Sequence, residues 1–477
     1  MSHTRGSGTL DLYIAGRDLP VDQSSAPAGP HRAPPGPNLW LQLAALCTVP
    51  LIMVLGNSML IPVLPDMGRV MGLSKAATGL AVTAFSLSAG IAIAVAGFLA
   101  DRYGRKLVVV PSLLVYGLGG IVSGLAGWRM GPNGFAVVMA GRVIQGIGAA
   151  GTAPVAMAFV GDLFRGGSRV TALGIFEASN GLGKVISPIL GALIGQVLVW
   201  WAVFFAYAVL AVPFALAVWF LTREPPRRKA PPAREYFGQV LTIFRRKGVA
   251  LIACFWAGTV ALFVLFGVLF FLSEHLETVH GIDGVPKGVR IMWPVLAMSA
   301  TSFAAGLFLQ RRGQLLKPAV VLGLALAIAG TVLIAFVRAD WAFYAGLIVA
   351  GIGTGLQLPG LNNLITSSAR TEQRAMITSV YGAVRFIGVA FGPPLYGALM
   401  RNGEALPFWF SAGVLATSLA ATLFLIRPER LVEAEDEAGA EAQGPDRREG
   451  GGGRGEVAIP AWEPPANLPL GTRAPLH

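Results

Sequence analysis

The chain has 477 residues, of which 54% are hydrophobic and only 13% are charged. A soluble globular protein has about 25% charged residues, so this composition excludes an ordinary soluble domain and indicates an integral membrane protein. The formal net charge of +12 is typical of nucleic-acid-binding proteins in soluble chains, whereas in a membrane protein its distribution between loops carries the information.

Residues 1–38 and 428–477 are rich in Pro, Gly and Ala, which predicts two disordered tails. Twelve apolar runs between them reach the length of about 20 residues that a helix needs to cross a bilayer. Lipid cannot satisfy backbone polar groups, so each run predicts a helix. The predicted spans are 40–64, 77–100, 107–128, 134–158, 170–195, 198–221, 248–272, 289–309, 318–337, 341–365, 375–399 and 406–426.

Lys and Arg are unequally divided between alternate loops. If the N-terminus lies in the cytoplasm, most of them fall in cytoplasmic loops, including the basic segment 223–247, and few fall outside, among them Arg69, Lys75 and Lys287. This bias predicts that both termini are cytoplasmic. The positive charge is therefore a topology signal, and no nucleic acid is expected as a partner. The predicted order is a six-helix bundle (39–222), the basic linker, and a second bundle (248–427).

The chain also repeats itself in three places. GFLADRYGRK at 97–106 has a weaker copy at 306–315, GIGAAGTAP at 146–154 has one at 351–359, and SPILGAL at 187–193 has one at 392–399. The copies come in the same order, each about 205 to 210 residues after the original. Such symmetry is typical of secondary transporters, whose substrate site lies near the midplane between the repeats.

These motifs resemble those of the major facilitator superfamily. The loop after the second span fits the family pattern at Gly97, Leu99, Asp101, Arg102, Gly104, Arg105 and Lys106. The fourth span contains RVIQGIGAA, with Arg142 and Gln145, and the fifth span resembles the antiporter motif at Gly183, Pro188 and Gly191. It departs from that motif at Ser187 and Ala192, where the family has glycines. The eleventh span carries Gly388, Gly392 and Pro393.

The resemblance implies an all-α membrane protein with the major facilitator fold, in which twelve transmembrane helices form two pseudo-symmetric six-helix bundles. It implies that Asp101 and Arg105 form a cytoplasmic latch between alternating states, with Asp162 and Arg169 as their partners. A role of these loop charges in topology alone is the alternative. The fifth-span motif points to drug:proton antiporters, in which small residues and Pro188 allow close helix packing.

Four charged residues lie deep within the predicted spans, namely Arg142, Glu177, Lys184 and Arg385. Charges at membrane depth are expensive, and each is therefore a functional candidate. We predict that Glu177 pairs with Arg142 and carries the proton, and that Lys184 and Arg385 attract an anionic or electron-rich substrate group. A static packing network is the alternative for all four, and Lys184 could instead reach toward the membrane surface.

Five amides at membrane depth are candidates to hydrogen-bond a substrate: Asn57, Gln145, Asn180, Gln357 and Asn362. Structural bonds between helices would explain them equally well.

The sequence therefore predicts a bacterial plasma-membrane transporter, monomeric, that exports small hydrophobic or amphiphilic compounds in exchange for protons. A sugar or other metabolite carrier of the same superfamily is the closest alternative, and a membrane enzyme or receptor is a weaker one. We expect no catalytic residue, metal or cofactor. The glycine-rich stretch around Lys184 is not an ATP-binding loop, because Ala178 and Val185 stand at two of its required positions.

Overall fold

The computed structural model describes residues 38–164, 166–224, 233–309, 312–337, 339–368 and 374–427. The two predicted tails, apart from residue 38, and residues 225–232 of the linker lie outside this part of the chain. Every regular element within it is a helix. The helices of the first half are α1 (Leu39–Ser58), η1 (Ile61–Val63), α2 (Leu64–Met71), α3 (Lys75–Tyr103), α4 (Arg105–Met130), η2 (Gly131–Gly134), α5 (Phe135–Ala150), α6 (Ala153–Leu163), α7 (Gly166–Val197) and α8 (Ala202–Leu221).

The second half begins with the longest helix, α9, which spans 46 residues. It joins the end of the predicted linker and the seventh predicted span in one helix. The helices of this half are α9 (Ala233–Thr278), α10 (Gly284–Leu309), η3 (Gly313–Leu315), α11 (Leu316–Phe336), α12 (Asp340–Ser367), α13 (Arg374–Leu399), η4 (Met400–Asn402) and α14 (Leu406–Leu425).

Two predicted spans are interrupted rather than continuous. The first is divided into α1, η1 and α2, with Pro62 and Pro65 at the breaks. The fourth is divided into α5 and α6 at Gly151 and Thr152, just before Pro154. Proline lacks the N–H that a helix interior needs and disfavours helical geometry in the preceding residue. The breaks therefore follow from local sequence.

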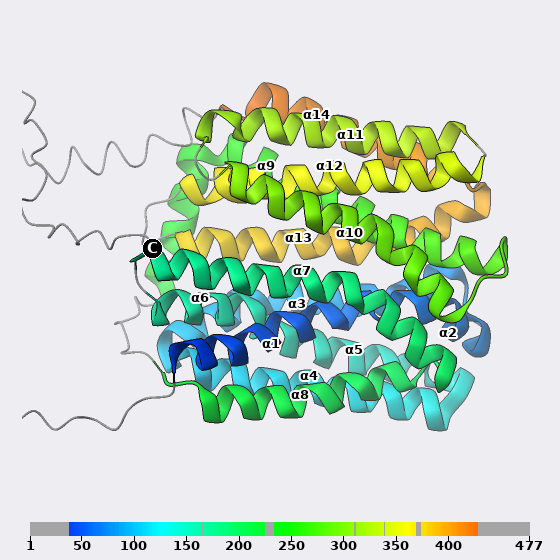
Figure 1. The fold of residues 1–477 in the computed structure, drawn as a ribbon, viewed down its shortest axis with the longest axis horizontal. Helices are drawn as coiled ribbons and strands as arrows, with labels where there is room; N and C mark the ends of the chain where they lie inside the picture. The colour runs from blue at the N-terminus through cyan, green and yellow to red at the C-terminus, as the bar shows by residue number, and fades with distance from the viewer. Residues whose placement is uncertain are drawn as a thin grey trace, which may run out of the picture.

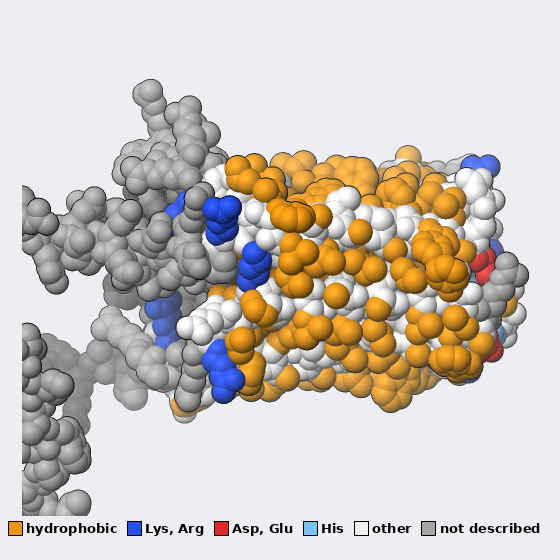
Figure 2. Space-filling view, turned by 90° about the horizontal axis from the view of Figure 1, so that it is seen from above, with side chains coloured by type: hydrophobic (Ala, Val, Ile, Leu, Met, Phe, Trp, Pro, Cys, Tyr) orange, Lys and Arg blue, Asp and Glu red, His pale blue; other side chains and the backbone are white. Residues whose placement is uncertain are grey.

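Ten helical segments of the described chain are long and apolar enough to cross a membrane. One of them, Arg105–Leu163, is 59 residues long and contains α4, α5 and α6, which is enough for two passes. Helix α7 does not meet the criterion, and it carries Glu177 and Lys184. Counting α7, the helices are consistent with twelve passes. Figure 2 shows one face covered largely by hydrophobic side chains, with charged side chains gathered toward the two ends.

The helices lie side by side along one direction, and α1 begins at the end of the bundle where α14 finishes (Figure 1). The halves contact each other mainly through α3 against α13 and α7 against α10. In each contact a glycine of one half packs against the backbone at a proline of the other half. A β-carbon at Gly79 of α3 would lie 2.6 Å from the nitrogen of Pro394, and one at Gly288 of α10 would lie 2.8 Å from the carbonyl oxygen of Pro188.

Glycine packing within each half also follows the sequence repeat. Gly146 packs against α3 and Gly148 against α4, whereas Gly351 packs against α10 and Gly353 against α11. Because α10 and α11 are the counterparts of α3 and α4, equivalent glycines contact equivalent helices. The tertiary structure thus confirms the internal repeat that the sequence predicted.

Candidate functional site

A fully buried arginine, Arg142 of α5, joins three helices of the first half. Its Nε donates to the carbonyl of Ala81 (2.9 Å), and its Nη1 donates to the carbonyl of Gly56 (2.8 Å) and to Oε1 of Gln145 (2.7 Å). Its Nη2 donates to Oδ1 of Asn57 (2.6 Å), and the guanidinium carbon lies 4.5 Å from the ring centroid of Phe85. The buried charge is thus solvated by neutral oxygens and an aromatic face.

The predicted pair between Glu177 and Arg142 is wrong in this structure. Glu177 is exposed, and its printed polar contact is with Asn180, whose Nδ2 donates to Oε2 at 3.2 Å. Arg142 has already used its donors on α1, α3 and α5. For the same reason Asn57 and Gln145 are not free substrate ligands: both accept hydrogen bonds from Arg142, which is the structural role that the sequence left open for them.

Helix α7 presents a polar face to the junction of the two halves. Glu177, Asn180 and Lys184 recur at spacings of three to seven residues and therefore lie along one side of the helix. One turn after Lys184 on that side, Pro188 contacts Gly288 of the other half. The adjacent side of α7 packs against α1, where Ser179 donates to the carbonyl of Cys47 at 2.6 Å.

Helix α13 contributes Arg385 from the second half. Its Nη1 lies 3.4 Å from Oδ1 of Asn362 on α12, and its guanidinium carbon lies 5.1 Å from the ring centroid of Tyr381. Gln357, which the sequence placed near the substrate, is fully buried against Gly323 of α11. Its amide nitrogen and oxygen have no hydrogen-bond partner among the described residues, and a contact of Gln357 with the substrate stays a prediction.

The predicted latch is assembled at the junction of α3, α4 and α6. Arg105 donates from Nη1 to Oδ1 of Asp101 at 2.8 Å and from Nε to Oδ2 of Asp162 at 3.1 Å. Arg169 forms no ion pair among the described residues and lies beside Gly161. Arg102 is exposed and points over the ring of Tyr103. Arg105 thus reaches both acidic partners, and the predicted partnership of Arg169 is not formed.

A carboxylate outside the predicted motif completes the latch. Glu224, just after α8, accepts hydrogen bonds from the backbone N–H groups of Arg105 (2.6 Å) and Lys106 (2.7 Å). In return, Nζ of Lys106 donates to the carbonyl of Thr222 at 2.9 Å. The Glu224 carboxylate accepts from free N–H groups at the start of α4, and the Lys106 ammonium donates to a free carbonyl at the end of α8. Each charge is opposite in sign to the partial charge of the helix end that it contacts. Gly104 is required here, because its φ is 111° and a β-carbon would lie 2.8 Å from Glu224.

Replacing Glu224 with alanine is expected to lower the free energy of unfolding by about 1 kcal/mol, the usual cost of a lost N-terminal cap. Glu224→Gln should fall between alanine and the natural protein, because glutamine still accepts a hydrogen bond but carries no charge. Thermal unfolding in detergent would measure both, with Glu404→Gln as an exposed control at the other end of the bundle. Equal melting temperatures for Glu224→Ala and the natural protein would contradict the cap.

The end of the bundle opposite the latch is closed by ion pairs that the sequence analysis missed. Glu277 of α9 accepts from Arg69 of α2 at 2.7 Å and from Lys287 of α10 at 2.7 Å, while Lys287 also lies 3.1 Å from Asp283. Arg69 also pairs with Asp66, and Lys75 pairs with Glu274 at 3.3 Å. Within the described residues, the ion pairs that cross between the halves all lie here.

Burial opposes ionisation of Asp283, but the N–H of Gly284 and the ammonium of Lys287 outweigh it and hold the pKa below its ordinary value. The stability that this carboxylate contributes is present above its unfolded pKa of about 4 and is lost only as the pH falls through the lower folded value. Oxygens of Asp66, Glu277 and Asp283 lie within 4.8 Å of one another. The cations of Arg69 and Lys287 pair with these three carboxylates and balance two of their charges.

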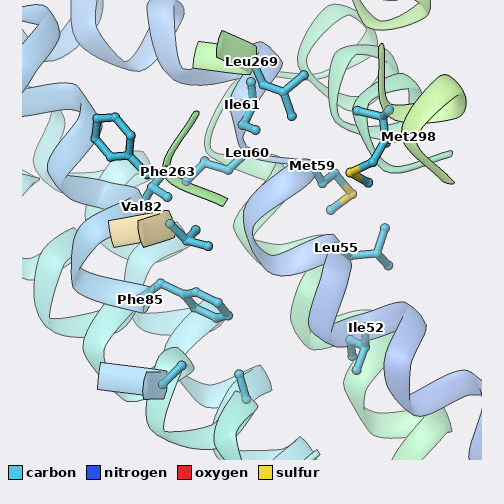
Figure 3. Close-up of a cluster of buried hydrophobic side chains, with 14 of the residues drawn as sticks. Ile52, Leu55, Met59, Leu60, Ile61, Val82, Phe85, Phe263, Leu269 and Met298 are labelled. Carbon is cyan, nitrogen blue, oxygen red and sulfur yellow. The ribbon is translucent and has the colours of Figure 1, made fainter. Parts of the chain in front are cut away.

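A hydrophobic seal adjoins these ion pairs. Figure 3 shows Met59 beside Met298 of α10, and Ile61 beside Leu269 of α9. Both Met59 and Ile61 are fully buried. Helix α7 closes tightly on this seal, because a β-carbon at Gly191 would lie 1.9 Å from the carbonyl oxygen of Met59. The seal separates the ion pairs from the polar face of α7.

Several glycines of the predicted packing motifs lie where two helices approach closely. A β-carbon at Gly183 would lie 3.1 Å from Leu51 of α1. In the second half, β-carbons at Gly388 and Gly392 would lie 2.0 Å and 2.6 Å from the carbonyl oxygens of Thr259 and Phe263 on α9. Gly97 approaches Ser379 of α13 across the halves. Backbones can approach this closely only where a side chain is absent.

Comparison with known protein families shows which family this chain belongs to. The family model described as Major Facilitator Superfamily matches residues 46–316 and 287–470. The chain belongs to the Major Facilitator Superfamily. It is therefore a secondary transporter and not an enzyme, and it is a multi-pass membrane protein.

Relatives of this transporter include named exporters. It is 40% identical over 397 residues to the bacillibactin exporter of Bacillus subtilis, covering 83% of this chain and 98% of the relative. It is 27% identical over 403 residues to multidrug resistance protein 1 of the same organism, covering 82% and 98%. The crystal structure of a D-xylose-proton symporter has a TM-score of 0.67 at 14% identity, covering 81% and 97%, which shows the shared fold.

Two groups of residues in this transporter escaped the sequence analysis. Glu224 stands outside the loop motif, and Lys287 was placed in an exposed outer loop although its side chain is only 1% exposed. The spacing of Asp283 and Lys287, one helical turn apart, was the available signal for the second group. No comparable signal links Glu224 to Arg105, because 119 residues separate them.

Proposed function

We propose that this transporter is a proton-coupled exporter of small amphiphilic compounds that works by alternating access in the plasma membrane. The relative that is 40% identical over nearly its whole length is named an exporter, and a more distant relative is named for multidrug resistance. Under this proposal the latch end faces the cytoplasm, both termini lie on that side, and one copy of the chain is sufficient.

The closed end of the bundle, opposite the latch, supports the proposal of alternating access. Ion pairs and the hydrophobic seal join the halves at the end opposite the latch. The polar residues of α7 and α13 lie on the latch side of that seal. Such a one-sided arrangement corresponds to a state that receives cargo from the cytoplasm, and rocking of the halves about the contacts at Gly79 and Gly288 would expose it to the other side.

Glu177 is the proposed proton carrier. Among the described carboxylates it is the one in the middle of a spanning helix, since Asp101, Asp162 and Glu274 all lie within a few residues of a helix end. It forms no ion pair with any of the described residues, and its hydrogen bond comes from the neutral amide of Asn180. A carboxylate without a fixed cationic partner is free to bind and release a proton as its surroundings change.

We expect Glu177→Gln to abolish cargo-driven proton movement while leaving cargo binding in place. The measurement is proton flux in proteoliposomes loaded with a pH-sensitive dye, under an imposed proton gradient. The cargo panel contains bacillibactin, lipophilic cations, neutral drugs, organic anions and sugars. Glu404→Gln, which removes an exposed carboxylate far from α7, is the matched control.

Each outcome separates the alternatives. Proton movement with one cargo class in the natural protein and in Glu404→Gln, but not in Glu177→Gln, supports antiport through Glu177. Full activity of Glu177→Gln would exclude this residue as the carrier. If sugars are taken up down their own gradient and no compound moves protons, the protein is a metabolite carrier instead.

A further inference from the structure

Two cations, Lys184 of α7 and Arg385 of α13, come from opposite halves of the transporter. Lys184 projects from the polar face of α7, one turn before the contact between Pro188 and Gly288. Arg385 is on α13, at the position that the sequence repeat makes equivalent to Asn180 of α7. The charged groups whose electrostatic influence reaches Lys184 are Glu177 on its own helix and Arg385 of the other half.

Neither cation has an anionic partner. Among the described residues, no carboxylate lies within 4.0 Å of the Lys184 ammonium or of the Arg385 guanidinium. Glu177 precedes Lys184 by seven residues, which is about 10 Å along the helix axis, and its hydrogen bond is with Asn180. Glu177, Lys184 and Arg385 together therefore carry an excess positive charge.

Arg385 also has unused donor capacity. Its bond to Asn362 is long, at 3.4 Å, and its Nε is buried without an acceptor among the described residues. The hydroxyl of Tyr381, over whose ring the guanidinium lies, is buried without a partner as well. Arg142 gives the contrast within the same chain, because all three of its nitrogens are bonded to protein oxygens.

An incompletely satisfied cation at membrane depth is costly, and two of like sign from separate halves repel each other. If Lys184 and Arg385 only held helices together, we would expect protein oxygens to satisfy their donors, as they do for Arg142. A ligand with negatively charged oxygens would supply the missing acceptors, since a guanidinium can bind a carboxylate through two parallel hydrogen bonds and an ammonium offers three donors.

The position of the pair suits a ligand that links the halves. The seal lies further along α7, where Gly191 packs on Met59 two turns beyond Lys184. A molecule entering from the latch side would meet the two cations before the closed seal. An anion between them would neutralise their repulsion and would join one helix of each half.

We propose that Lys184 and Arg385 form a binding site for the negative group of an organic anion, contributed by both halves of the transporter. This inference rests on the proposed function and names its cargo class. Arg385 supplies the planar donor pair and Lys184 the opposing charge. The neutral amides of Asn180 and Asn362 flank the site from the two halves.

Binding in detergent, without any gradient, tests the site separately from transport. The probes are 2-naphthoate, its uncharged analogue 2-naphthamide, and 2-naphthylmethylammonium, which share one aromatic body and differ in charge. We expect 2-naphthoate to raise the melting temperature of the natural protein and the other two to have little effect. Lys184→Met and Arg385→Met should each weaken 2-naphthoate binding at least tenfold. Arg129→Met, which removes an exposed arginine beside Trp128, should not.

Lys184→Arg and Arg385→Lys control for loss of folding, because each keeps the positive charge. We expect both variants to retain part of the 2-naphthoate binding. Binding of 2-naphthoate that survives both methionine substitutions would overturn the proposal. So would equal or tighter binding of the amide or the ammonium compound, or no binding of 2-naphthoate to the natural protein. Export of a lipophilic cation in the proteoliposome assay would overturn the anion site while leaving the exporter proposal intact.

Discussion

Arg142→Met is expected to remove most of the folded transporter. Methionine retains an apolar stem over Phe85 but donates no hydrogen bond. An acceptor that is buried without a partner costs about 1–3 kcal/mol. The whole net stability of a typical protein is about 5–15 kcal/mol, so several such losses together are comparable with it. The acceptors that lose their donor are the carbonyl oxygens of Gly56 and Ala81 and the side-chain oxygens of Asn57 and Gln145.

Fluorescence-detected gel filtration and thermal unfolding in detergent would measure the effect of Arg142→Met. Arg142→Lys should be intermediate, since an ammonium keeps the charge but cannot reproduce the planar set of donors. Arg129→Met, at an exposed site, should leave the melting temperature unchanged. A well-folded Arg142→Met protein that has lost only proton coupling would show that Arg142 serves the transport cycle rather than the assembly of α1, α3 and α5.

Lys287→Met is expected to open the end of the transporter opposite the latch. The substitution leaves Asp66, Glu277 and Asp283 facing one another with Arg69 as the cation they share. Removing one partner of a buried ion pair costs about 3–5 kcal/mol. We expect a value toward the lower end, because Asp283 is 58% exposed and water screens part of its charge. In the closed state Asp66 of the first half is held against Glu277 and Asp283 of the second half, whereas opening would part Asp66 from them and let water reach all three carboxylates, so the open state gains population.

The opening can be followed by thiol labelling of Ile61→Cys, which places a reporter in the seal at a fully buried position. The background would carry Cys47→Ser and Cys254→Ser to remove the two natural cysteines. Lys287→Met should speed labelling at least tenfold. Adding Asp283→Asn should reverse part of that gain, because it relieves the repulsion and leaves the Arg69–Glu277 pair between the halves in place, and Lys317→Met, near the latch end, is the control. Labelling that stays slow in Lys287→Met would show that the seal alone holds the closure.

The ion pairs at the two ends of the transporter differ in whether they join the two halves. The latch charges Asp101, Arg105 and Asp162 all belong to the first half in this structure. At the other end, Arg69 and Lys75 of the first half pair with Glu277 and Glu274 of the second. An alternating-access cycle requires one end to be joined while the other is released, and this distribution matches the proposed state that is open toward the cytoplasm.

The sequence by itself determined the helical spans, the internal repeat and the motif positions, and the breaks within two spans, although not predicted, also follow from local prolines. These features depend on short-range chemistry. Apolar length decides whether a segment can cross a bilayer, proline interrupts a helix within one turn, and a glycine at a crossing such as Gly191 can be read from its spacing. The pairing of Arg105 with Asp162 was an expectation from the family resemblance, which also named Arg169.

Only the tertiary structure decided which buried charges are satisfied. Arg142 is bonded to backbone carbonyls of Gly56 and Ala81, and any residue type supplies a carbonyl, so no pattern in the sequence could reveal these partners. Lys287 is buried because the carboxylates of Glu277 on α9 and of Asp283, just before α10, converge on it. Arg385 and Lys184 remain without anions because the helices that surround them bring amides and an aromatic ring instead. The cost of a charge in a membrane depends on such neighbours, and they come together only when distant helices pack.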